Sequence, residues 1–531
     1  MSDRKPRILI LGAGVMQGPA LRIAAEMGLE TVAADGDPNA PCASLAHRFV
    51  QVDLKDRGGI EALGRSLMEH GGLDAVMTAG TDFSATVAWA AEKLELPGIP
   101  FDSALDASDK ERMRSRFKEA GVPSPLFTIL KNIPESGRSL PFSWPAVVKP
   151  VDNMGSRGCR RVDNFDELKS AVAEALKFSR SGRVIVEEYM EGPEFSIDAL
   201  VYRGELTVCG IADRHIFFPP YFIEMGHTMP SASSVADISA ILDVFSRGIK
   251  ALGITNGAAK GDVKLSPRGA MIGEIAARLS GGYMSGWTYP YSAGVLPTRG
   301  AIEIALGKKP GGLTPKWNWV AAERAFISIP GKVCSITGVE NARVMPWVRD
   351  VFTRIKPGSP VSFPENNVSK CGNIISAAPC RADAVNSAEN AARSILIRLE
   401  ARNEATEKFL AQVPEPSSLS GFKFPPDAFS VNSSLLSLLS AMPEQTGARH
   451  HSDSRLLAFP EFTESGLRDY MGRSVKESLD AVRALTGMEL PVAVNPAADI
   501  PLFGRSFWQA LIRGGYQGAV YYIDSMQAKN E

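Results

Sequence analysis

The chain has 531 residues, of which 44% are hydrophobic and 22% are charged, and its formal net charge is −1. This composition is ordinary for a folded protein and excludes a disordered or fibrous chain. A length well above roughly 250–300 residues predicts several domains. The near-neutral charge provides no broad basic surface, so we expect no nucleic-acid partner.

The first hundred residues alternate between strand and helix patterns. An apolar run at 7–11 enters the glycine turn 12–18, a helical pattern follows, and further strand patterns end at residues 35, 52 and 78. This β–α–β order predicts a doubly wound parallel sheet to about residue 105. The turn has GxGxxxG spacing, which we interpret as a structural strand-to-helix turn. An NAD(P)-binding oxidoreductase built on residues 7–35 is an alternative hypothesis.

The next segment predicts a helix from Ser108 to Ala120, a strand at 146–150 and a small-residue loop at 153–158. The backbone N–H groups of such a loop can surround phosphates, and Lys149 at the strand end can add a positive charge. A helix at 165–178 and a strand at 184–189 follow. Two acids, Glu187 and Glu194, lie around the end of that strand, where carboxylates can accept hydrogen bonds from an adenine amine and ribose hydroxyls.

Residues 261–282 predict a hairpin with a Ser-Pro-Arg-Gly turn and a glycine loop after its second strand. Asp262 and Glu274 lie on opposite arms, and the turn can bring them to one side of the sheet. Arg278 follows where the strand ends. Mg²⁺ in proteins takes one or two carboxylates together with substrate phosphates, so this hairpin suits Mg²⁺ and a triphosphate.

Proline, glycine and serine mark two boundaries in the second half of the chain. The connector 309–315 precedes a predicted α+β unit that runs to residue 403, and the linker 414–418 precedes a separate region at 420–531. Within that last region, residues 501–508 predict a helix and residues 514–522 predict a strand.

Taken in order, these motifs resemble the ATP-grasp superfamily over residues 1–310. The resemblance implies a Rossmann-like domain at 1–105 that does not use NAD, followed by an ATP-grasp domain at 106–310. It implies that ATP is bound by the lysines, the loop and the acids, and that the hairpin carboxylates bind Mg²⁺, with Mn²⁺ as an alternative ion. The implied ATP contacts are Lys110, Lys149, Gly155, Ser156, Arg157, Gly158, Glu187, Glu188, Met190 and Glu194, and the implied metal ligands are Asp262 and Glu274.

Two finer motifs look like the L-amino-acid ligases that make dipeptides. The pair Glu224 and His227 resembles their Glu-x-x-His motif, and Arg278 with Gly281 resembles their ARxxG motif. The resemblance places Glu224, His227, Arg278 and Gly281 in the substrate site, with Glu224 facing the substrate amino group and Arg278 and Gly281 holding the reacting carboxyl. Arg278 and His227 are the catalytic candidates: Arg278 would stabilise the transferring group, and either His227 or the phosphate itself would accept the proton of the attacking amine. Residues 315–403 resemble the C-terminal domain of the same group. Many relatives carry Asn where this chain has Ala276, which leaves the number of metal ions open.

The implied activity is ATP-dependent formation of an amide through an acyl phosphate, with an amino acid as the expected carboxylate. One alternative is an ATP-grasp carboxylase or carbamoyl-phosphate-type enzyme, which the Glu224–His227 pair disfavours because bicarbonate has no amino group. Another is a non-catalytic nucleotide-binding regulator, which Ala276 alone supports.

The remaining sequence features concern location and partners. No apolar run approaches the ~20 residues of a membrane helix, the N-terminus lacks the pattern of a signal peptide, and six scattered cysteines include no CxxC pair. We therefore expect a cytoplasmic protein that acts on small carboxylate and amine substrates, without a membrane partner. A homodimer is compatible with the sequence.

Overall fold

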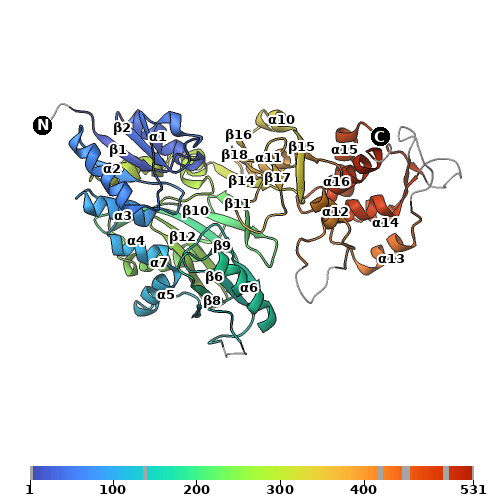
Figure 1. Ribbon diagram of the computed structural model, residues 1–531, viewed down its shortest axis with the longest axis horizontal. Coiled ribbons are helices and arrows are strands. Elements are labelled where there is room, and N and C mark those ends of the chain that lie inside the picture. The colour runs from blue at the N-terminus through green and yellow to red at the C-terminus, as the bar shows by residue number, and fades with distance from the viewer. Residues whose placement is uncertain (1–3, 136–139, 417–422, 445–454, 494–501, 529–531) are drawn as a thin grey trace. The chain divides into compact units, whose positions relative to one another are not determined.

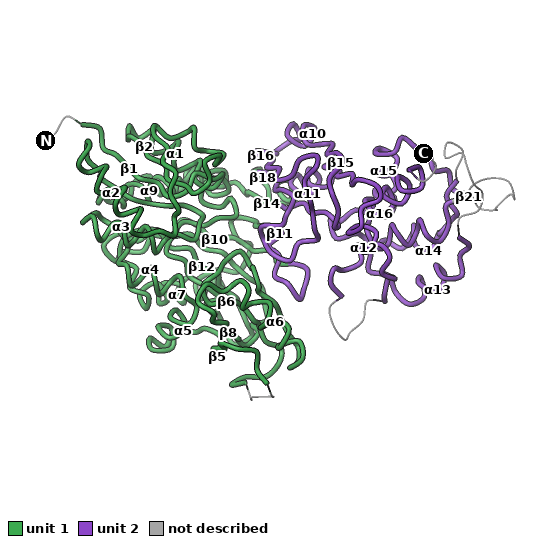
Figure 2. Tube along the Cα trace, viewed as in Figure 1, with its two compact units in different colours: residues 1–216, 226–323, 377–385 green, residues 217–225, 324–376, 386–531 purple. Residues whose placement is uncertain are grey.

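The computed structural model describes residues 4–135, 140–416, 423–444, 455–493 and 502–528 (Figure 1). The chain divides into two compact units (Figure 2). The first consists of residues 1–216, 226–323 and 377–385, and the second of residues 217–225, 324–376 and 386–531. The predicted domains 1–105 and 106–310 lie mainly in the first unit, and most of 315–403 lies with 420–531 in the second. The exact bounds of the four predicted domains stay predictions.

The N-terminal part of the first unit is a parallel four-stranded sheet in the order β3-β2-β1-β4. Strands β1, β2 and β4 are almost completely buried, as expected for a parallel sheet that is covered on both faces, whereas the edge strand β3 is partly exposed. The doubly wound fold predicted from the β–α–β pattern is confirmed. Its strands are β1 (Arg7–Leu11), β2 (Glu30–Asp35), β3 (Arg48–Gln51) and β4 (Ala75–Met77), and its helices are α1 (Gly18–Glu26), α2 (Arg57–Glu69), α3 (Ser84–Lys93) and α4 (Phe101–Ser108).

Two antiparallel sheets follow within the first unit. The smaller has the order β5-β8-β6-β7, and one of its faces packs on α6 through a core of Val, Leu and Ala side chains. Asn164 caps α6 by accepting a hydrogen bond from the Glu167 N–H. The elements are β5 (Phe127–Leu130), β6 (Ala146–Pro150), β7 (Arg160–Val162), α6 (Phe165–Phe178) and β8 (Val184–Glu188).

The larger sheet of the first unit contains the hairpin β12–β13, and its strands are ordered β13-β12-β9-β10. Helices α5 and α7 cover one face, where Phe117, Phe195 and Phe245 are completely buried. The elements are α5 (Lys110–Glu119), β9 (Glu194–Tyr202), β10 (Glu205–Phe217), α7 (Val235–Ala251), β12 (Gly257–Ser266) and β13 (Gly269–Ala276). A π-helical turn at Met284–Thr288, α8 (Tyr289–Ala293) and α9 (Pro297–Ala305) follow. Strand β11 (Ile223–Met229) passes from the second unit to the first after Met225.

The second unit combines an α+β part with a largely helical C-terminal region. In the α+β part, β15 pairs with β17 and β19, and β16 pairs with β18. Its elements include β14 (Val320–Phe326), β15 (Gly331–Thr337), α10 (Val339–Arg343), β16 (Val348–Thr353), β17 (Pro360–Val361), β18 (Gly372–Ala378), α11 (Arg381–Ser394) and β19 (Leu396–Leu399). Three of these, β14, β18 and α11, include residues of the first unit.

Helix α12 (Glu404–Leu410) precedes the C-terminal region. That region contains α13 (Ser433–Ala441), β20 (Arg455–Leu457), α14 (Pro460–Thr463), α15 (Val475–Thr486), β21 (Val492–Ala493), β22 (Leu502–Phe503) and α16 (Arg505–Gln527). The strand predicted at 514–522 is wrong, because this segment belongs to α16. A break at Gly515, with φ of 61° and ψ of −153°, divides α16 into two helices. They approach so closely that a Cβ on Gly518 would lie 2.1 Å from the Ala510 oxygen. Ser417, Ser418 and Pro501, which belong to predicted elements, lie outside the described residues.

Among the helices of the described segments, none is both long and apolar enough to cross a bilayer.

Candidate active site

The hairpin β12–β13 places Asp262 and Glu274 directly opposite each other in register. Asp262 is buried and accepts a hydrogen bond from the Ser196 hydroxyl at 2.7 Å. Lys260 pairs with the same carboxylate, and Arg214 lies 3.3 Å from it. Burial acts to raise the pKa of Asp262, but Arg214 and Lys260 outweigh it and hold the pKa below its ordinary value. The carboxylate is therefore kept ionised.

Glu274 faces Lys110, whose Nζ lies 3.5 Å from its Oε1. Burial opposes ionisation of Glu274, but Lys110, Lys260, Lys149 and Arg278 lower its pKa to about 2. Lys110 is itself buried at the start of α5, and its Nζ donates to the Asn153 carbonyl at 2.7 Å. Burial acts against the ammonium of Lys110, yet Glu274 raises its pKa above the ordinary value. Lys110 thus contacts both Glu274, a candidate metal ligand, and the start of the loop 153–158.

A second buried ion cluster is centred on Glu187, at the end of β8. Its Oε2 lies 2.5 Å from Lys149 Nζ, and its Oε1 accepts from Arg114 Nε at 2.7 Å. Arg114 is completely buried on α5, one turn after Lys110, and also donates to the Gly273 carbonyl at 2.6 Å. Burial acts to raise the pKa of Glu187, but Arg114 and Lys149 lower it. Glu187 therefore fixes the position of Lys149; its contact with adenine stays a prediction.

The loop 153–158 is held by the Asn153 side chain. Its Oδ1 accepts from the Met154 N–H at 2.9 Å and from Arg157 at 3.1 Å. Gly155, Ser156 and Gly158 all have positive φ, at 70°, 59° and 67°. A Cβ on Gly158 would lie 2.8 Å from the Phe178 ring. Glycine at position 158 is therefore required both by the backbone conformation and by the space below the loop.

The remaining predicted ATP contacts surround the turn between β8 and β9. Glu188 pairs with Arg268 at 2.8 Å. Lys264 donates to the Met190 carbonyl at 2.9 Å and lies 3.8 Å from Glu194. Lys264 thus holds the turn that contains Met190 next to the first residue of β9.

Arg278 lies directly after β13 and near the loop 153–158. One terminal nitrogen donates to the Leu279 carbonyl at 2.9 Å, and the other lies 3.6 Å from the Met154 sulfur. Asp82, after β4, lies 3.7 Å from Arg180. Burial raises the pKa of Asp82, and the charge of Arg278 is the largest of those that oppose the rise. A carboxylate from the loop after β4 thus lies within the field of the Arg278 guanidinium.

The segment that contains Gly281 is anchored by a buried acid. Asp198 on β9 accepts from the Ser280 N–H at 3.1 Å and from the Ser280 hydroxyl at 2.7 Å. Gly281 packs against Gly80, where a Cβ would lie 3.3 Å from the Gly281 Cα. The carboxylate and the close glycine pair fix the backbone that follows Arg278.

Strand β11 contains Glu224 and His227. Three residues apart on a strand, their side chains point to opposite faces. His227 Nδ1 lies 3.0 Å from Glu323 on β14, and both side chains are buried. This contact fixes the orientation of the imidazole ring. Glu224 belongs to the second unit, where its N–H donates to Asn367 at 2.8 Å.

Five side chains that the sequence reasoning missed hold the predicted residues in place. They differ in how visible they are in the sequence. Lys260 lies two residues before Asp262 and hence on the same strand face, and Arg114 lies one helical turn after Lys110, so both could have been inferred from periodicity. The others come from distant strands. The five are Arg114, Asp198, Arg214, Lys260 and Glu323.

The N-terminal glycine turn is filled by its own side chains. Gln17 accepts from the Gly14 N–H at 2.9 Å and donates to the Ala79 carbonyl. Asp35, at the end of β2, accepts from the Ala13 N–H at 2.8 Å. In dinucleotide-binding folds the turn N–H groups face the pyrophosphate and the acid holds the ribose. Here both are used internally, which supports a structural role for the turn; the absence of NAD(P) binding stays a prediction.

The acidic groups fit a magnesium ion that is bound together with phosphates. Among the described residues, no three His, Cys, Asp or Glu side chains form a metal-binding group. Asp262 and Glu274, facing each other and ionised, supply two hard oxygen donors, and Mg²⁺ at such sites completes its shell with water and phosphate. Ala276 adds no further donor. The protein's own contribution is therefore two carboxylates.

Comparison with known families agrees with this geometry. Residues 142–286 match the ATP-grasp domain, and residues 325–400 match the L-amino acid ligase C-terminal domain 2.

The chain contains an ATP-grasp domain.

Individual proteins are also similar to the chain. The uncharacterized protein y4rH of Sinorhizobium fredii is 26% identical over 326 residues, which cover 60% of this chain and 67% of that protein. Carnosine synthase 1 of Gallus gallus is 26% identical over 332 residues, 57% of this chain but only 35% of that protein. The L-amino acid ligase of Bacillus licheniformis has a similar fold, with a TM-score of 0.65 and 23% sequence identity. The match covers 75% of this chain and 100% of the ligase chain. The predicted superfamily and fold class are confirmed.

Proposed function

We propose that this chain is an ATP-dependent carboxylate–amine ligase that forms an amide through an acyl phosphate, with an amino acid as the activated acid. The observation that carries the proposal is the facing pair Asp262 and Glu274, surrounded by lysines on β12, α5 and β6. The two domain matches and the similarity to carnosine synthase 1 and to an L-amino acid ligase support it.

In this proposal the nucleotide lies between the loop 153–158 and the β12–β13 hairpin. Lys149 and Lys110 neutralise phosphate charge, the loop N–H groups surround phosphate oxygens, and the Glu187–Met190 segment with Glu194 holds the nucleoside. Asp262 and Glu274 hold Mg²⁺, which when bound supplies positive charge to the β- and γ-phosphates. Because the two carboxylates are ionised in the protein, no proton has to leave before the ion binds.

The reaction has two steps. A carboxylate oxygen of the acid attacks the γ-phosphorus of ATP, the bond to the β,γ-bridging oxygen breaks, and an acyl phosphate and ADP result. A neutral amine then attacks the acyl carbon, phosphate leaves, and the amine proton passes to a base. Phosphoryl transfer depends mainly on positioning and charge neutralisation. Arg278, fixed by the anchored segment that follows it, stabilises the transferring group and then the oxyanion.

Two residues of β11 take the substrate roles. Glu224 attracts the ammonium of the activated amino acid through a charge-assisted hydrogen bond. His227, whose Nδ1 lies 3.0 Å from Glu323, is the candidate base that receives the amine proton. This assignment favours an amino acid over bicarbonate as the acid.

The test is a phosphate-release screen of amino acids offered in pairs with ATP and Mg²⁺, followed by mass spectrometry for the condensed product. ADP, phosphate and a product whose mass equals the two acids less one water are expected for at least one pair. Phosphate release with bicarbonate alone would favour the carboxylase. No ADP with any acid would refute the ligase.

A further inference from the structure

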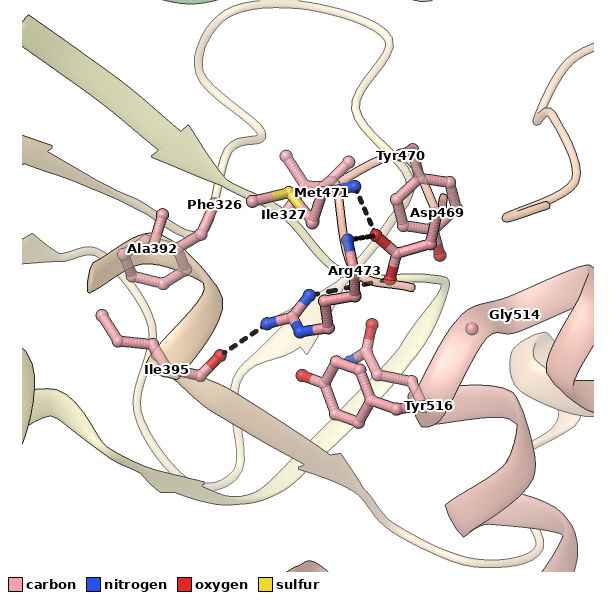
Figure 3. A pocket seen from close by; sticks show the side chains of 12 residues that line it. Phe326, Ile327, Ala392, Ile395, Asp469, Tyr470, Met471, Arg473, Gly514 and Tyr516 are labelled. Atoms are coloured by element: carbon pink, nitrogen blue, oxygen red, sulfur yellow. Dashed lines mark hydrogen bonds and ion pairs between the residues drawn. The ribbon is translucent and has the colours of Figure 1, made fainter. Parts of the chain in front are cut away.

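The C-terminal region, residues 420–531, is joined to the α+β part of the second unit by buried polar contacts. The Ile397 N–H donates to the Tyr516 hydroxyl at 2.8 Å, and Gln517 donates to the Ser328 hydroxyl at 2.9 Å. Arg473 lies 3.7 Å from Asp469 and donates to backbone carbonyls of the α+β part (Figure 3). Buried polar groups need partners, so these contacts fix the two parts against each other. The region is thus integral to the second unit.

Two aromatic side chains of this region extend the contact toward the segment 217–225. Phe424 lies 4.5 Å from Tyr221, centroid to centroid, and Tyr470 lies 6.2 Å from Phe218, both edge to face. Phe363 packs between them, at 5.6 Å from Phe424 and 5.3 Å from Tyr470. We call these five residues the aromatic cluster. Each such pair contributes roughly 0.5–1.5 kcal/mol beyond its buried area.

The same segment contains Glu224, whose backbone is held by residues that follow Phe363. The Glu224 N–H donates to Asn367 at 2.8 Å, and its carbonyl accepts from the buried Lys370 at 2.6 Å. Ile223 and Met225, on either side, pack into the apolar core that contains Phe363. Both the chain before Glu224 and the loop that holds it therefore rest on the aromatic cluster.

We propose that Phe424 and Tyr470 are positioning residues for Glu224, so that residues 420–531 form part of the device that holds an α-ammonium substrate. The inference rests on the proposed function for one point, namely that the ligand of Glu224 is the ammonium of an amino acid. Tyr470 acts through its ring, since its hydroxyl is buried without a hydrogen-bond partner among the described residues. In this role the region is a structural support of substrate binding.

The test uses the full chain with Phe424→Leu and Tyr470→Leu, and with Tyr470→Phe as the conservative variant. Phe462→Leu is the matched control, because its ring packs 5.2 Å from Phe429 in the core of the C-terminal region and does not belong to the aromatic cluster. Two quantities are measured: hydrogen exchange of the peptide 217–225, and KM for the amino acid and for ATP separately.

We expect faster exchange of 217–225 in Phe424→Leu and Tyr470→Leu, and a KM for the activated amino acid raised about tenfold, equivalent to roughly 1.4 kcal/mol. KM for ATP should stay within about twofold. Tyr470→Phe should behave like the wild type, and Phe462→Leu should lower the melting temperature without either effect. Exchange unchanged in both leucine variants, or equal changes in Phe462→Leu, would overturn the positioning role. If the exchange effect is found but the wild type turns over no amino acid, the proposed function fails and the support of the Glu224 segment stands.

Discussion

At the scale of single residues, the candidate site consists of buried charges that neutralise one another in pairs. Glu274 differs from Glu187 and Asp262 because 32% of its side chain is exposed, against 2% and 9% for theirs. An exposed carboxylate oxygen can reach an ion that arrives from solvent. We therefore regard Glu274 as the ligand that a metal meets first.

Glu274→Gln should abolish ATP turnover, because a neutral amide is a poorer Mg²⁺ ligand than a carboxylate. Phosphate release at saturating ATP measures the loss, and circular dichroism checks that the variant is folded. Glu119→Gln, on the exposed end of α5, is the control and should retain activity. Unchanged phosphate release in Glu274→Gln would disprove the metal assignment.

Arg114→Met should destabilise the first unit by on the order of 3 kcal/mol, because removing one partner of a buried ion pair leaves uncompensated charge. It should also raise KM for ATP, since Glu187 then holds Lys149 less firmly. Thermal unfolding and ATP kinetics measure the two effects. The control is Arg116→Met, two residues along α5, where Arg112 also pairs with the shared Asp106. Equal effects in both variants would contradict the role of the buried cluster.

At the scale of elements, the sequence pattern predicted the hairpin that carries the two candidate metal ligands. The hairpin and the facing of its carboxylates follow from two apolar runs and a Ser-Pro-Arg-Gly turn, and the register confirms them. The strand predicted at 514–522 was wrong because its apolar and aromatic residues also suit a helix that is buried on every side. Contacts such as Arg214 with Asp262, or His227 with Glu323, join strands far apart in the chain, and no local pattern encodes them.

On β11, Glu224→Ala should raise KM for the activated amino acid roughly 10- to 150-fold, because a charge-assisted hydrogen bond contributes about 1.5–3 kcal/mol. KM for ATP should change little. Arg278→Ala should instead lower kcat, since the charge that it stabilises develops during the reaction. Kinetics with each substrate varied in turn separate the two. A Glu224→Ala variant that weakened only ATP binding would rule out the Glu-x-x-His assignment.

The N-terminal glycine turn should bind no NADPH, because Gln17 and Asp35 already use its N–H groups. Fluorescence titration of the wild type should show no saturable binding in the micromolar range. Gln17→Ala should also fail to bind, since Asp35 remains on the Ala13 N–H. Saturable binding by the wild type would restore the oxidoreductase hypothesis.

At the scale of the whole molecule, we expect acid to destabilise the first of the two units through three carboxylates of the candidate site. Glu274, Glu187 and Asp262 all have pKa values below their ordinary range. Such groups stabilise the folded state above the unfolded pKa, and this contribution is lost as pH falls through the folded value. For Glu274 the window runs from its ordinary 4.5 down to about 2.

We therefore expect the melting temperature to fall steeply below about pH 4.5, and to fall less steeply in Glu274→Gln, which has no carboxylate to protonate. Melting curves from pH 7 to pH 3 on both proteins measure the difference. Glu119→Gln, altered at an exposed site, should follow the wild type. Parallel curves for wild type and Glu274→Gln would show that this carboxylate does not contribute to acid sensitivity.

Lys110 couples the binding of the metal ion to the binding of the nucleotide. A metal ion on Glu274 competes with Lys110 for that carboxylate, and a phosphate oxygen competes with Glu274 for Lys110. Each ligand therefore breaks the same lysine–carboxylate pair that opposes the other. When both ligands bind, the pair is broken only once, so metal and nucleotide should bind with positive cooperativity. By linkage, the metal raises the affinity for the nucleotide by the same factor as the nucleotide raises the affinity for the metal.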